Sequence, residues 1–368
     1  MPNVWLPDAQ SPNLVLRHPT REECTETWKA WYEEQEYMTT ILADEDLPPG
    51  QQPILACCES IRKRALTSDA KGTVEEVVVP GIASVFCFPE YRGCGYPKRM
   101  MQELAKVLRM RQLDGLRCAG SILYSDIGKK YYAKLGWHPN ATNRHFEFEP
   151  SPTAWPLEAK SLSVDDLREM CERDEAIVRS AIAVPSPGVE KRITILPTVD
   201  HMLWHIAWEE FACSHLFEKI LPAKGAIAGS PGSQVWAIWT HRYYSHPDTK
   251  EHLNVLYILR LVVEADETAT RLPSDSKERL GDKKEEEQMS YLKAVLQAAQ
   301  REAYEWKLDV VRLWDPTPLV QDILKRSGVE FELVEREDDY IASAIRYREG
   351  HDRATAPLWV NNEHYAWL

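Results

Sequence analysis

The sequence lacks the long apolar segments that membrane proteins need. No run approaches the about 18 consecutive apolar residues of a spanning helix. The opening stretch, MPNVWLPDAQSPN, also lacks the basic-then-apolar order of a secretory signal. We therefore expect a cytoplasmic protein without a membrane partner.

The cysteines are scattered, and the sequence contains no paired metal-binding spacing. The eight cysteines lie at positions 24, 57, 58, 87, 94, 118, 171 and 213. Structural zinc sites need close pairs of ligands, which this pattern does not supply. In a chain of this length it favours reduced thiols in a cytosol-like compartment, and we expect no metal.

Basic residues are outnumbered and do not cluster. The chain has 44 Lys and Arg against 57 Asp and Glu, a net charge of −13. Residues 1–150 hold 18 basic and 20 acidic residues, and the remainder holds 26 and 37. Phosphate contacts need clustered Lys and Arg, so we expect no nucleic-acid partner. The acidic second half either accommodates a cationic ligand or is simply a solvated, self-repelling surface.

The 368 residues suffice for two domains, each with its own core. Hydrophobic periodicity and turn residues predict a first block of mixed strands and helices, and a similar order recurs in the C-terminal half. In the first block we expect strands at 14–18, 53–67, 74–88 (broken at Pro80-Gly81), 115–125 and 143–150, and helices from the capping box Thr20–Glu23, after residue 95, and at 129–136.

Beyond a linker at 151–156, the same signals continue to the end of the chain. We expect helices at 162–183, 200–220, 285–306 and 317–328, strands at 234–244, 253–265 and 309–314, and a hairpin formed by FELVERE and YIASAIRY.

The stretch FPEYRGCGYPKRMM (88–101) places two glycines between a strand and a helix. A strand that enters a glycine-rich loop and then a helix presents free backbone N–H groups to an anion. Gly95 has no side chain to block that approach. Taken alone, the two glycines are equally well explained by a tight turn.

A second motif, LYSDIGKKYYAKLGW (123–137), follows about thirty residues later. Together the two stretches resemble the GCN5-related N-acetyltransferase (GNAT) family, which carries Arg/Gln-x-x-Gly-x-Gly/Ala after a strand and a later Tyr-x-x-x-Gly helix. The resemblance implies an α/β fold with a central mixed twisted sheet and flanking helices. It also implies acetyl-CoA as co-substrate.

By this resemblance, the amides from Arg92 through Gly93, Cys94 and Gly95 to Tyr96 bind the pyrophosphate of coenzyme A. Pro97 departs from the family pattern and lacks an N–H, for which Lys98 or Arg99 is expected to compensate, unless both are simply solvated. The pantetheine arm is expected to lie along Phe86, Cys87 and Phe88 and to bond Ser125.

Tyr132 falls on the position of the family's tyrosine, a phenol able to protonate the departing thiolate. The alternative is a tyrosine that only packs on Tyr131 and Trp137.

The base that takes the proton of the acceptor amine is less clear, because the strand at 82–88 carries no acid. Glu75, Glu76 and Asp126 are the nearest candidates in sequence, and we name Asp126. In the second half, His201, His205 and Glu209 share one helix face. His-x-x-x-His can bind zinc, but zinc would need a third ligand and a catalytic glutamate at the right place. We instead expect Asp200, His205 and Glu209 to line a polar substrate pocket or to decorate a half-buried helix.

With LYSDIG before the tyrosine helix, a D-H-x-x-W-H helix at 200–205 and a degenerate second half, nearly the whole chain resembles the fungal lysine acetyltransferases, which convert free L-lysine to N6-acetyl-lysine in lysine breakdown. This implies a GNAT catalytic domain at 1–150, a helical linker at 151–195 and a degenerate GNAT-like domain at 196–368 that shapes the acceptor site. Another small amine, such as a diamine or a fungal secondary metabolite, is an alternative acceptor. A protein or histone acetyltransferase and a catalytically decayed coenzyme A scaffold are further alternatives. The aromatic tail WVNNEHYAWL is expected to be docked.

Overall fold

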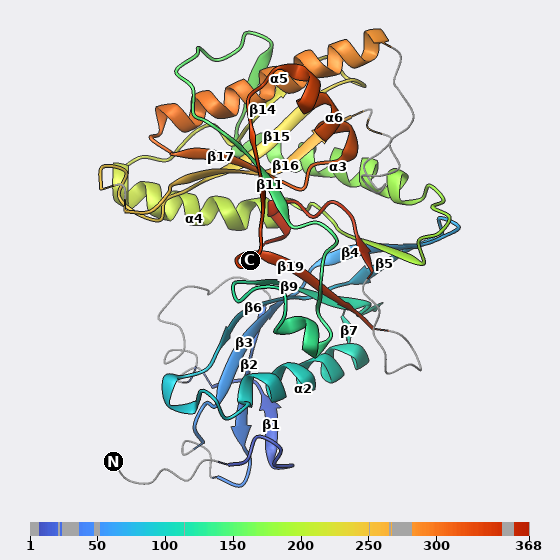
Figure 1. Cartoon of the computed structure of the whole chain (residues 1–368), viewed down its shortest axis with the longest axis vertical. Helices are drawn as coiled ribbons and strands as arrows, with labels where there is room; N and C mark the ends of the chain where they lie inside the picture. The colour runs from blue at the N-terminus through green and yellow to red at the C-terminus, as the bar shows by residue number, and fades with distance from the viewer. Residues whose placement is uncertain are drawn as a thin grey trace.

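The computed structural model describes residues 7–20, 23, 37–47, 52–113, 115–249, 251–264, 266, 282–347 and 357–367. Two layered α/β halves are stacked along the long axis of the molecule (Figure 1). The blue-to-cyan N-terminal half lies below, the yellow-to-orange C-terminal half lies above, and the C-terminus lies between them.

The lower half is built on a mixed sheet with one long helix across it. Within the described residues its strand order is β1-β2-β3-β6-β9-β19-β10. These strands are β1 (Leu14–Arg17), β2 (Tyr37–Asp44), β3 (Ala56–Ile61), β6 (Gly81–Phe86), β9 (Gly120–Ser125), β19 (Ile341–Arg346) and β10 (His138–Pro139). Helix α2 (Tyr96–Met110) buries Met100, Leu104 and Leu108 against this sheet. The repeat of these apolar residues predicted that contact, and burial of each such side chain contributes about 1.5–3 kcal/mol.

The upper half is a second mixed sheet that is covered on both faces. Its described strand order is β12-β14-β15-β16-β17-β11-β18. The strands are β12 (Ala159–Leu162), β14 (Gly225–Ala228), β15 (Val235–Arg242), β16 (Val255–Val263), β17 (Val310–Trp314), β11 (Arg144–Phe148) and β18 (Glu332–Glu335). Trp236 and Ile238 of β15 pack with α3 (Leu167–Ile182) and α4 (Val199–Phe217). The β15 residues that alternate with Trp236 and Ile238 point to the opposite face and pack with α5 (Asp282–Glu305) and α6 (Pro318–Ser327). This alternation follows from the two-residue period of a strand.

A smaller sheet lies between the halves. Its described order is β20-β13-β4-β5, from β20 (Leu358–Trp359), β13 (Lys191–Ile195), β4 (Arg64–Asp69) and β5 (Val74–Val78). A two-stranded ribbon, β7 (Gln112–Leu113) and β8 (Leu116–Arg117), follows α2. The small sheet therefore joins strands from both ends of the chain.

The prediction of a hairpin in the last third of the chain is wrong. β18 pairs with β11, whereas β19 inserts between β9 and β10 in the lower sheet. β19 is buried along almost its whole length and needs a neighbour on each side, whereas β18 is mostly exposed and suits an edge. Since β11 and β19 each complete the sheet of the other half, the boundaries 1–150, 151–195 and 196–368 remain a prediction.

Most of the other predicted elements are confirmed within about five residues. The break at Pro80 separates β5 from β6, and Gly136, with φ of 105°, ends a short 3-10 helix at Tyr132–Leu135. The capping box is present, because Thr20 N–H donates to Glu23 and Glu23 N–H donates to Thr20 Oγ1. The rest of that predicted helix lies outside the described residues. None of the described helices is both long and apolar enough to cross a membrane.

Candidate active site

The loop that contains Gly93 and Gly95, called the glycine loop below, leads directly into the N-terminus of α2. Gly93 and Gly95 have φ of 81° and 89°, a backbone conformation that costs other residues free energy. The first helical bond runs from Arg99 N–H to Gly95 O, over 3.1 Å. Arg92 N–H donates to Pro89 O over 3.3 Å. The amides between Arg92 and Arg99 are not used by the helix and lie at its positive end, where an anion is favoured.

The charged and aromatic side chains of this loop have different surroundings. Arg92 is exposed, and its Nε donates to Cys87 O over 3.1 Å, which ties the loop to the end of β6. Tyr96 is fully buried and its hydroxyl donates to Pro7 O, so only its backbone is available to a ligand. Arg99 is paired with Glu103 at 3.0 Å, whereas Lys98 is exposed. Lys98 thus remains the better candidate to replace the missing amide of Pro97.

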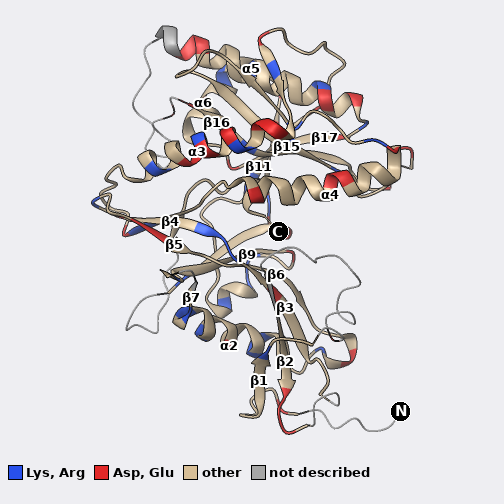
Figure 2. Cartoon of the chain, turned by 180° about the vertical axis from the view of Figure 1, so that it is seen from behind, with Lys and Arg blue, Asp and Glu red and all other residues tan. Residues whose placement is uncertain are grey.

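Figure 2 shows basic residues along α2, directly after this loop. The helix carries four basic residues and one acidic residue in a chain whose net charge is −13. This local excess of positive charge favours an anionic ligand at the loop.

The lower sheet opens beside the loop. β6 and β9 are parallel neighbours only at Gly81–Ile122 and Ile82–Leu123. Beyond these pairs, β6 continues along β3 and β9 continues along β19. A bulge in β6 next to the opening leaves Ser84 with φ of 53°. Bulges redirect the backbone of one strand, and beyond Ile82 and Leu123 no strand pairing joins β6 to β9.

Glu59 is an acidic residue bonded to the β6 bulge that sequence reasoning missed. It lies on β3 opposite Ala83, is 7% exposed, and accepts a hydrogen bond from Ser84 Oγ over 3.0 Å. Burial raises the pKa of Glu59 above its ordinary value. The available signal was a single carboxylate within the otherwise uncharged strand ACCESI.

Tyr132 lies in the 3-10 helix after β9 and is 9% exposed. Its ring meets that of Tyr131 edge-on, with centroids 5.1 Å apart. Burial, with a smaller contribution from Tyr131, raises the pKa of Tyr132 far above its ordinary value. The phenol therefore holds its proton at neutral pH, as a general acid must, and it also packs in the core beneath α2.

Ser125 and Asp126 end β9 and are tied to neighbouring backbone. Ser125 Oγ donates to Gly128 O over 2.8 Å and accepts from Ile127 N–H over 3.2 Å. Asp126 Oδ1 accepts from Tyr340 N–H over 3.0 Å, and partial desolvation raises its pKa. The hydroxyl donor of Ser125 is thus used by its own turn, and Asp126 is bonded to the residue that precedes β19.

The residues expected along pantetheine line the outer end of β6. Phe86 is 40% exposed and meets Phe88 edge-on, with centroids 5.1 Å apart. Cys87 Sγ donates to Leu55 O over 3.3 Å, and burial raises the pKa of its thiol. Cys94 is exposed in the loop. The raised pKa makes Cys87 a poor nucleophile.

Glu75 and Glu76 are poor candidates for the base. The hydrogen bond from Arg117 holds the pKa of Glu75 below its usual range. Burial raises the pKa of Glu76, but the hydrogen bonds from Arg179 and Arg64 outweigh this effect, so its pKa lies below the ordinary value. Both residues lie on β5 in the small sheet rather than at the opening.

The three residues expected to share a substrate pocket have separate surroundings. Asp200 is exposed at the start of α4. His205 is buried, lies 3.4 Å from Tyr365 O, and has its pKa lowered by burial to about 3. Glu209 is buried in a network with Lys224 and His241. The polar pocket expected from this helix is therefore not built by these side chains.

No cluster of three or more His, Cys, Asp and Glu side chains with metal-binding geometry occurs in the part of the chain that the structure describes. His201 instead contacts Leu196 O over 3.1 Å.

The C-terminal tail is docked between the halves, as expected. Glu363 is buried, pairs with Arg260, and accepts from Leu261 N–H over 2.8 Å. Arg260 also pairs with Asp174 at 2.8 Å. Next to Glu363, His364 stacks on Tyr257 with centroids 4.0 Å apart.

The tail completes an aromatic cluster that adjoins the end of β9. Its members are Tyr124, Tyr257, Trp314, Tyr340, Trp359, His364 and Trp367. Tyr340 also holds Asp126 through its backbone N–H. Aromatic side chains of the C-terminal half therefore pack against Tyr124 at the end of β9.

Comparison with known proteins agrees with this arrangement. A family described as "LYC1 GNAT-like C-terminal domain" matches residues 145–368. A lysine acetyltransferase of Yarrowia lipolytica is 23% identical over 231 residues, which are 51% of this chain and 57% of that protein. The match thus spans less than two thirds of that relative.

Solved structures show lower similarity. A probable N-acyltransferase from Enterococcus faecalis has a TM-score of 0.49 and 12% identity, over 91% of this chain and 73% of that one. The N-myristoyltransferase of Saccharomyces cerevisiae with bound myristoyl-CoA has a TM-score of 0.48 and 10% identity, over 96% and 84%. The family match covers more than half of the sequence, and the chain belongs to the GNAT family with a LYC1-like C-terminal domain.

Proposed function

We propose that this protein transfers the acetyl group of acetyl-CoA to the amine of a small molecule, namely the N6-amine of free L-lysine. The observation that carries the proposal is the opening between β6 and β9 directly beside the glycine loop. The loop supplies an anion site for the pyrophosphate, and the opening supplies unpaired strand backbone for the pantetheine arm. The relative from Yarrowia lipolytica, named a lysine acetyltransferase, supports the choice of acceptor.

The proposed reaction is a direct transfer. The neutral amine attacks the thioester carbonyl, the new C–N bond forms and the C–S bond breaks. Glu59, directly or through a water, takes the proton of the attacking amine, and Tyr132 gives its proton to the leaving thiolate. Backbone N–H groups at the bulge of β6 stabilise the oxyanion. Glu59 replaces Asp126 as our choice of base, because Glu59 is bonded to the bulge of β6 next to the opening.

The C-terminal half serves this reaction by enclosing the acceptor. We propose that the domain division at residues 150 and 195 separates a coenzyme A-binding part from an acceptor-binding part, with β19 and the tail linking them. The reduced cysteines suit a reaction in the cytoplasm during amino-acid metabolism.

A panel of acceptors tests the proposal. Thiol release from acetyl-CoA would be followed with free amino acids, diamines and a histone peptide. We expect turnover with lysine and none with the peptide. Turnover with the peptide alone would identify a protein acetyltransferase. Tight acetyl-CoA binding without turnover of any amine would identify a decayed scaffold, the alternative that Pro97 favours.

A further inference from the structure

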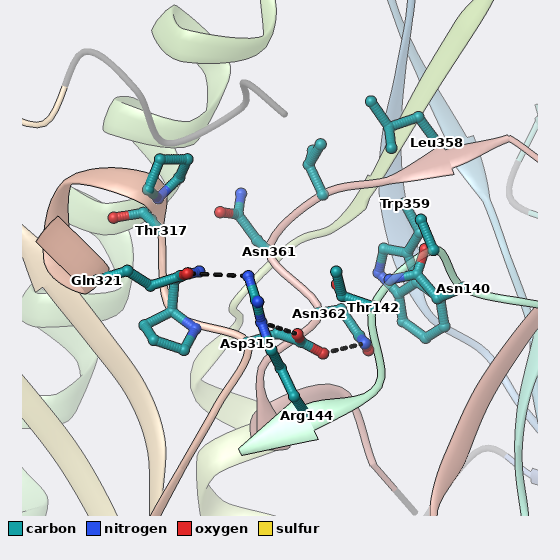
Figure 3. Close-up of a pocket in the computed structure, with 14 residues that line it drawn as sticks. Asn140, Thr142, Arg144, Asp315, Thr317, Gln321, Leu358, Trp359, Asn361 and Asn362 are labelled. Carbon is teal, nitrogen blue, oxygen red and sulfur yellow. Dashed lines mark hydrogen bonds and ion pairs between the residues drawn. The ribbon is translucent and has the colours of Figure 1, made fainter. Parts of the chain in front are cut away.

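A pocket that includes no residue of the sheet opening lies next to β11. It is formed by the loop before β11, the start of α6, and the stretch 358–362, and Figure 3 shows its lining side chains. Its volume is about 60 Å³. Since one buried water needs about 10–15 Å³ of such space, the pocket has room for on the order of five non-hydrogen atoms.

Five buried polar atoms on the residues that line this pocket have no hydrogen-bond partner among the described residues. Three are acceptors and two are donors: Oδ1 of Asp315, Asn361 and Asn362, Nε of Arg144, and Nε1 of Trp359. The Asp315 side chain is 6% exposed, and Asn362 and Trp359 are 2% and 3% exposed. A buried polar atom without a partner costs about 1–3 kcal/mol, so this group indicates a missing ligand.

Other polar atoms of these residues are already bonded, which fixes their orientation, and the Asp315 carboxyl also accepts hydrogen bonds from the Thr142 side chain and the Arg144 backbone. Arg144 Nη2 donates to Gln321 Oε1 over 2.8 Å, and Asn362 Nδ2 donates to Asp315 Oδ2 over 3.0 Å. Asn361 Nδ2 donates to Thr194 over 3.3 Å. Because both amide nitrogens are used, the carbonyl oxygens of Asn361 and Asn362 are the atoms left for a ligand.

The charged groups around the pocket favour a ligand that carries both a negative and a positive group. Arg144 Nε lies 3.8 Å from Asp315 Oδ1, and Arg336 Nη2 lies 3.8 Å from Oδ2. These distances are within reach of charge attraction but too long for hydrogen bonds. Two guanidinium groups face one carboxylate, so a second carboxylate would balance them. Three acceptor oxygens match the three N–H groups of a primary ammonium.

We infer that this pocket binds the head group of a free α-amino acid. The ligand's carboxylate accepts from Arg144 and Trp359, and its ammonium donates to Asp315, Asn361 and Asn362. An amino-acid head group has five non-hydrogen atoms, which matches the volume of the pocket. A diamine has no carboxylate and leaves both donors unpaired.

The pocket adjoins the proposed reaction site without belonging to it. The rings of Trp359 and Tyr124 have centroids 5.7 Å apart, and Tyr124 follows Leu123, the last residue of β9 that pairs with β6. The amino acid is therefore either the acetyl acceptor itself or an effector bound behind this aromatic wall. Its binding does not rest on the proposed acetyl transfer.

Calorimetry on the full chain without acetyl-CoA tests the binding. L-Lysine would be compared with cadaverine, which lacks the carboxylate, and with 6-aminohexanoate, which lacks the α-amine. L-Leucine, isopentylamine and 4-methylpentanoate form a second set. We expect at least one amino acid to bind at least tenfold more tightly than both of its truncated analogues. Equal binding of the amine, or no binding of either amino acid, would overturn the inference.

Variants locate the site. Asp315→Asn and Trp359→Phe should each weaken amino-acid binding at least tenfold, whereas Glu330→Gln, in a separate groove, should not. Trp359→Phe keeps the aromatic ring, so it tests the donor even if Asp315→Asn fails to fold. Unchanged binding in a folded Trp359→Phe protein would place the amino acid elsewhere. A matching rise in KM for the acceptor identifies the ligand as substrate, and an unchanged KM identifies an effector.

These results are separable from the proposed function. Amino-acid binding without acetyl transfer would leave the pocket assignment intact and refute the enzyme proposal. Acetyl transfer to lysine, with no effect of Asp315→Asn or Trp359→Phe on binding, would support the enzyme proposal and refute the pocket assignment.

Discussion

Ser84 donates a hydrogen bond to Glu59 across 3.0 Å, from the bulge of β6 to the neighbouring strand β3. The bond fixes a buried carboxylate at the point where β6 and β9 part. Burial raises the pKa of Glu59, which makes its anion a stronger base than an exposed glutamate.

Replacement of Glu59 should separate activity from stability. We expect Glu59→Gln to lower kcat by about 10²-fold or more, as for the loss of a general base. A raised folded pKa means that the ionised carboxylate destabilises the folded state above its ordinary pKa. The glutamine variant should therefore unfold at an equal or higher temperature at pH 8. Ser84→Ala, which removes only the hydrogen bond, is the control and should have a smaller effect on kcat.

A variant that keeps full activity would exclude Glu59 as the base. The wild-type rate should also fall as pH decreases through the raised pKa of this carboxyl, and that acidic limb should be absent from the residual activity of Glu59→Gln.

Tyr132 and Tyr131 form a matched pair of neighbouring rings. Tyr132→Phe should lower kcat at least tenfold without weakening acetyl-CoA binding, because it removes a proton donor and keeps the ring. Tyr131→Phe should retain most of the activity. Equal loss in both variants would mean that the phenols act through packing rather than through proton transfer.

Gly95 has φ of 89° at the start of α2. Gly95→Ala should cost about 1 kcal/mol or more of folding stability and weaken acetyl-CoA binding, since it disturbs the amides of the loop. Gly328, with φ of 70° after α6, has open space around it. Gly328→Ala should carry a similar strain and leave acetyl-CoA affinity unchanged. Similar affinity losses in both variants would contradict a specific role for the loop.

The buried group Asp174–Arg260–Glu363 holds the C-terminal tail. Arg260→Met should destabilise the fold by about 3–5 kcal/mol, because two carboxylates lose their cation in the interior. Limited proteolysis should then cut near residue 360. Arg64→Met, which removes a partly exposed cation near Glu76 and Glu175, should cost only about 1 kcal/mol. Equal effects of the two changes would argue against a special role for the buried group.

His241 lies between Glu209 at 2.8 Å and Glu302 at 3.1 Å. Burial lowers its pKa, but the attraction and hydrogen bonds of the two carboxylates outweigh this and raise it to about 9. The stability from this group is fully present below the ordinary pKa of about 6.5 and is lost as pH rises through about 9. Urea unfolding between pH 6.5 and 9 should show this decline, and the decline should be absent from His241→Gln.

The local elements were readable from the sequence, but their pairing was not. Repeated apolar residues in α2 and the breaks at Pro80 and Gly136 are local signals, and the structure confirms them. The exchange of β11 and β19 between the sheets depends on contacts about 200 residues apart, such as Ala342 N–H to Asn143 Oδ1. No periodicity encodes that separation.

The candidate site divides in the same way. The loop glycines and Tyr132 belong to motifs with fixed spacing, so the sequence located them. Glu59 lies on β3, and a bulge in the neighbouring strand decides which β6 residues lie opposite it. The pocket lined by Asp315 joins three segments that are distant in the sequence. Conversely, the regular spacing of His205 and Glu209 suggested one pocket, but burial gave each a separate structural partner.

The most direct test is to incubate the protein with acetyl-CoA and L-lysine and to identify the product by mass spectrometry and NMR. We expect N6-acetyl-lysine and free coenzyme A in equal amounts, at a rate that Tyr132→Phe lowers at least tenfold. Absence of any acetylated amine, although acetyl-CoA binds and the Gly95→Ala variant weakens that binding, would contradict acetyl transfer at this opening.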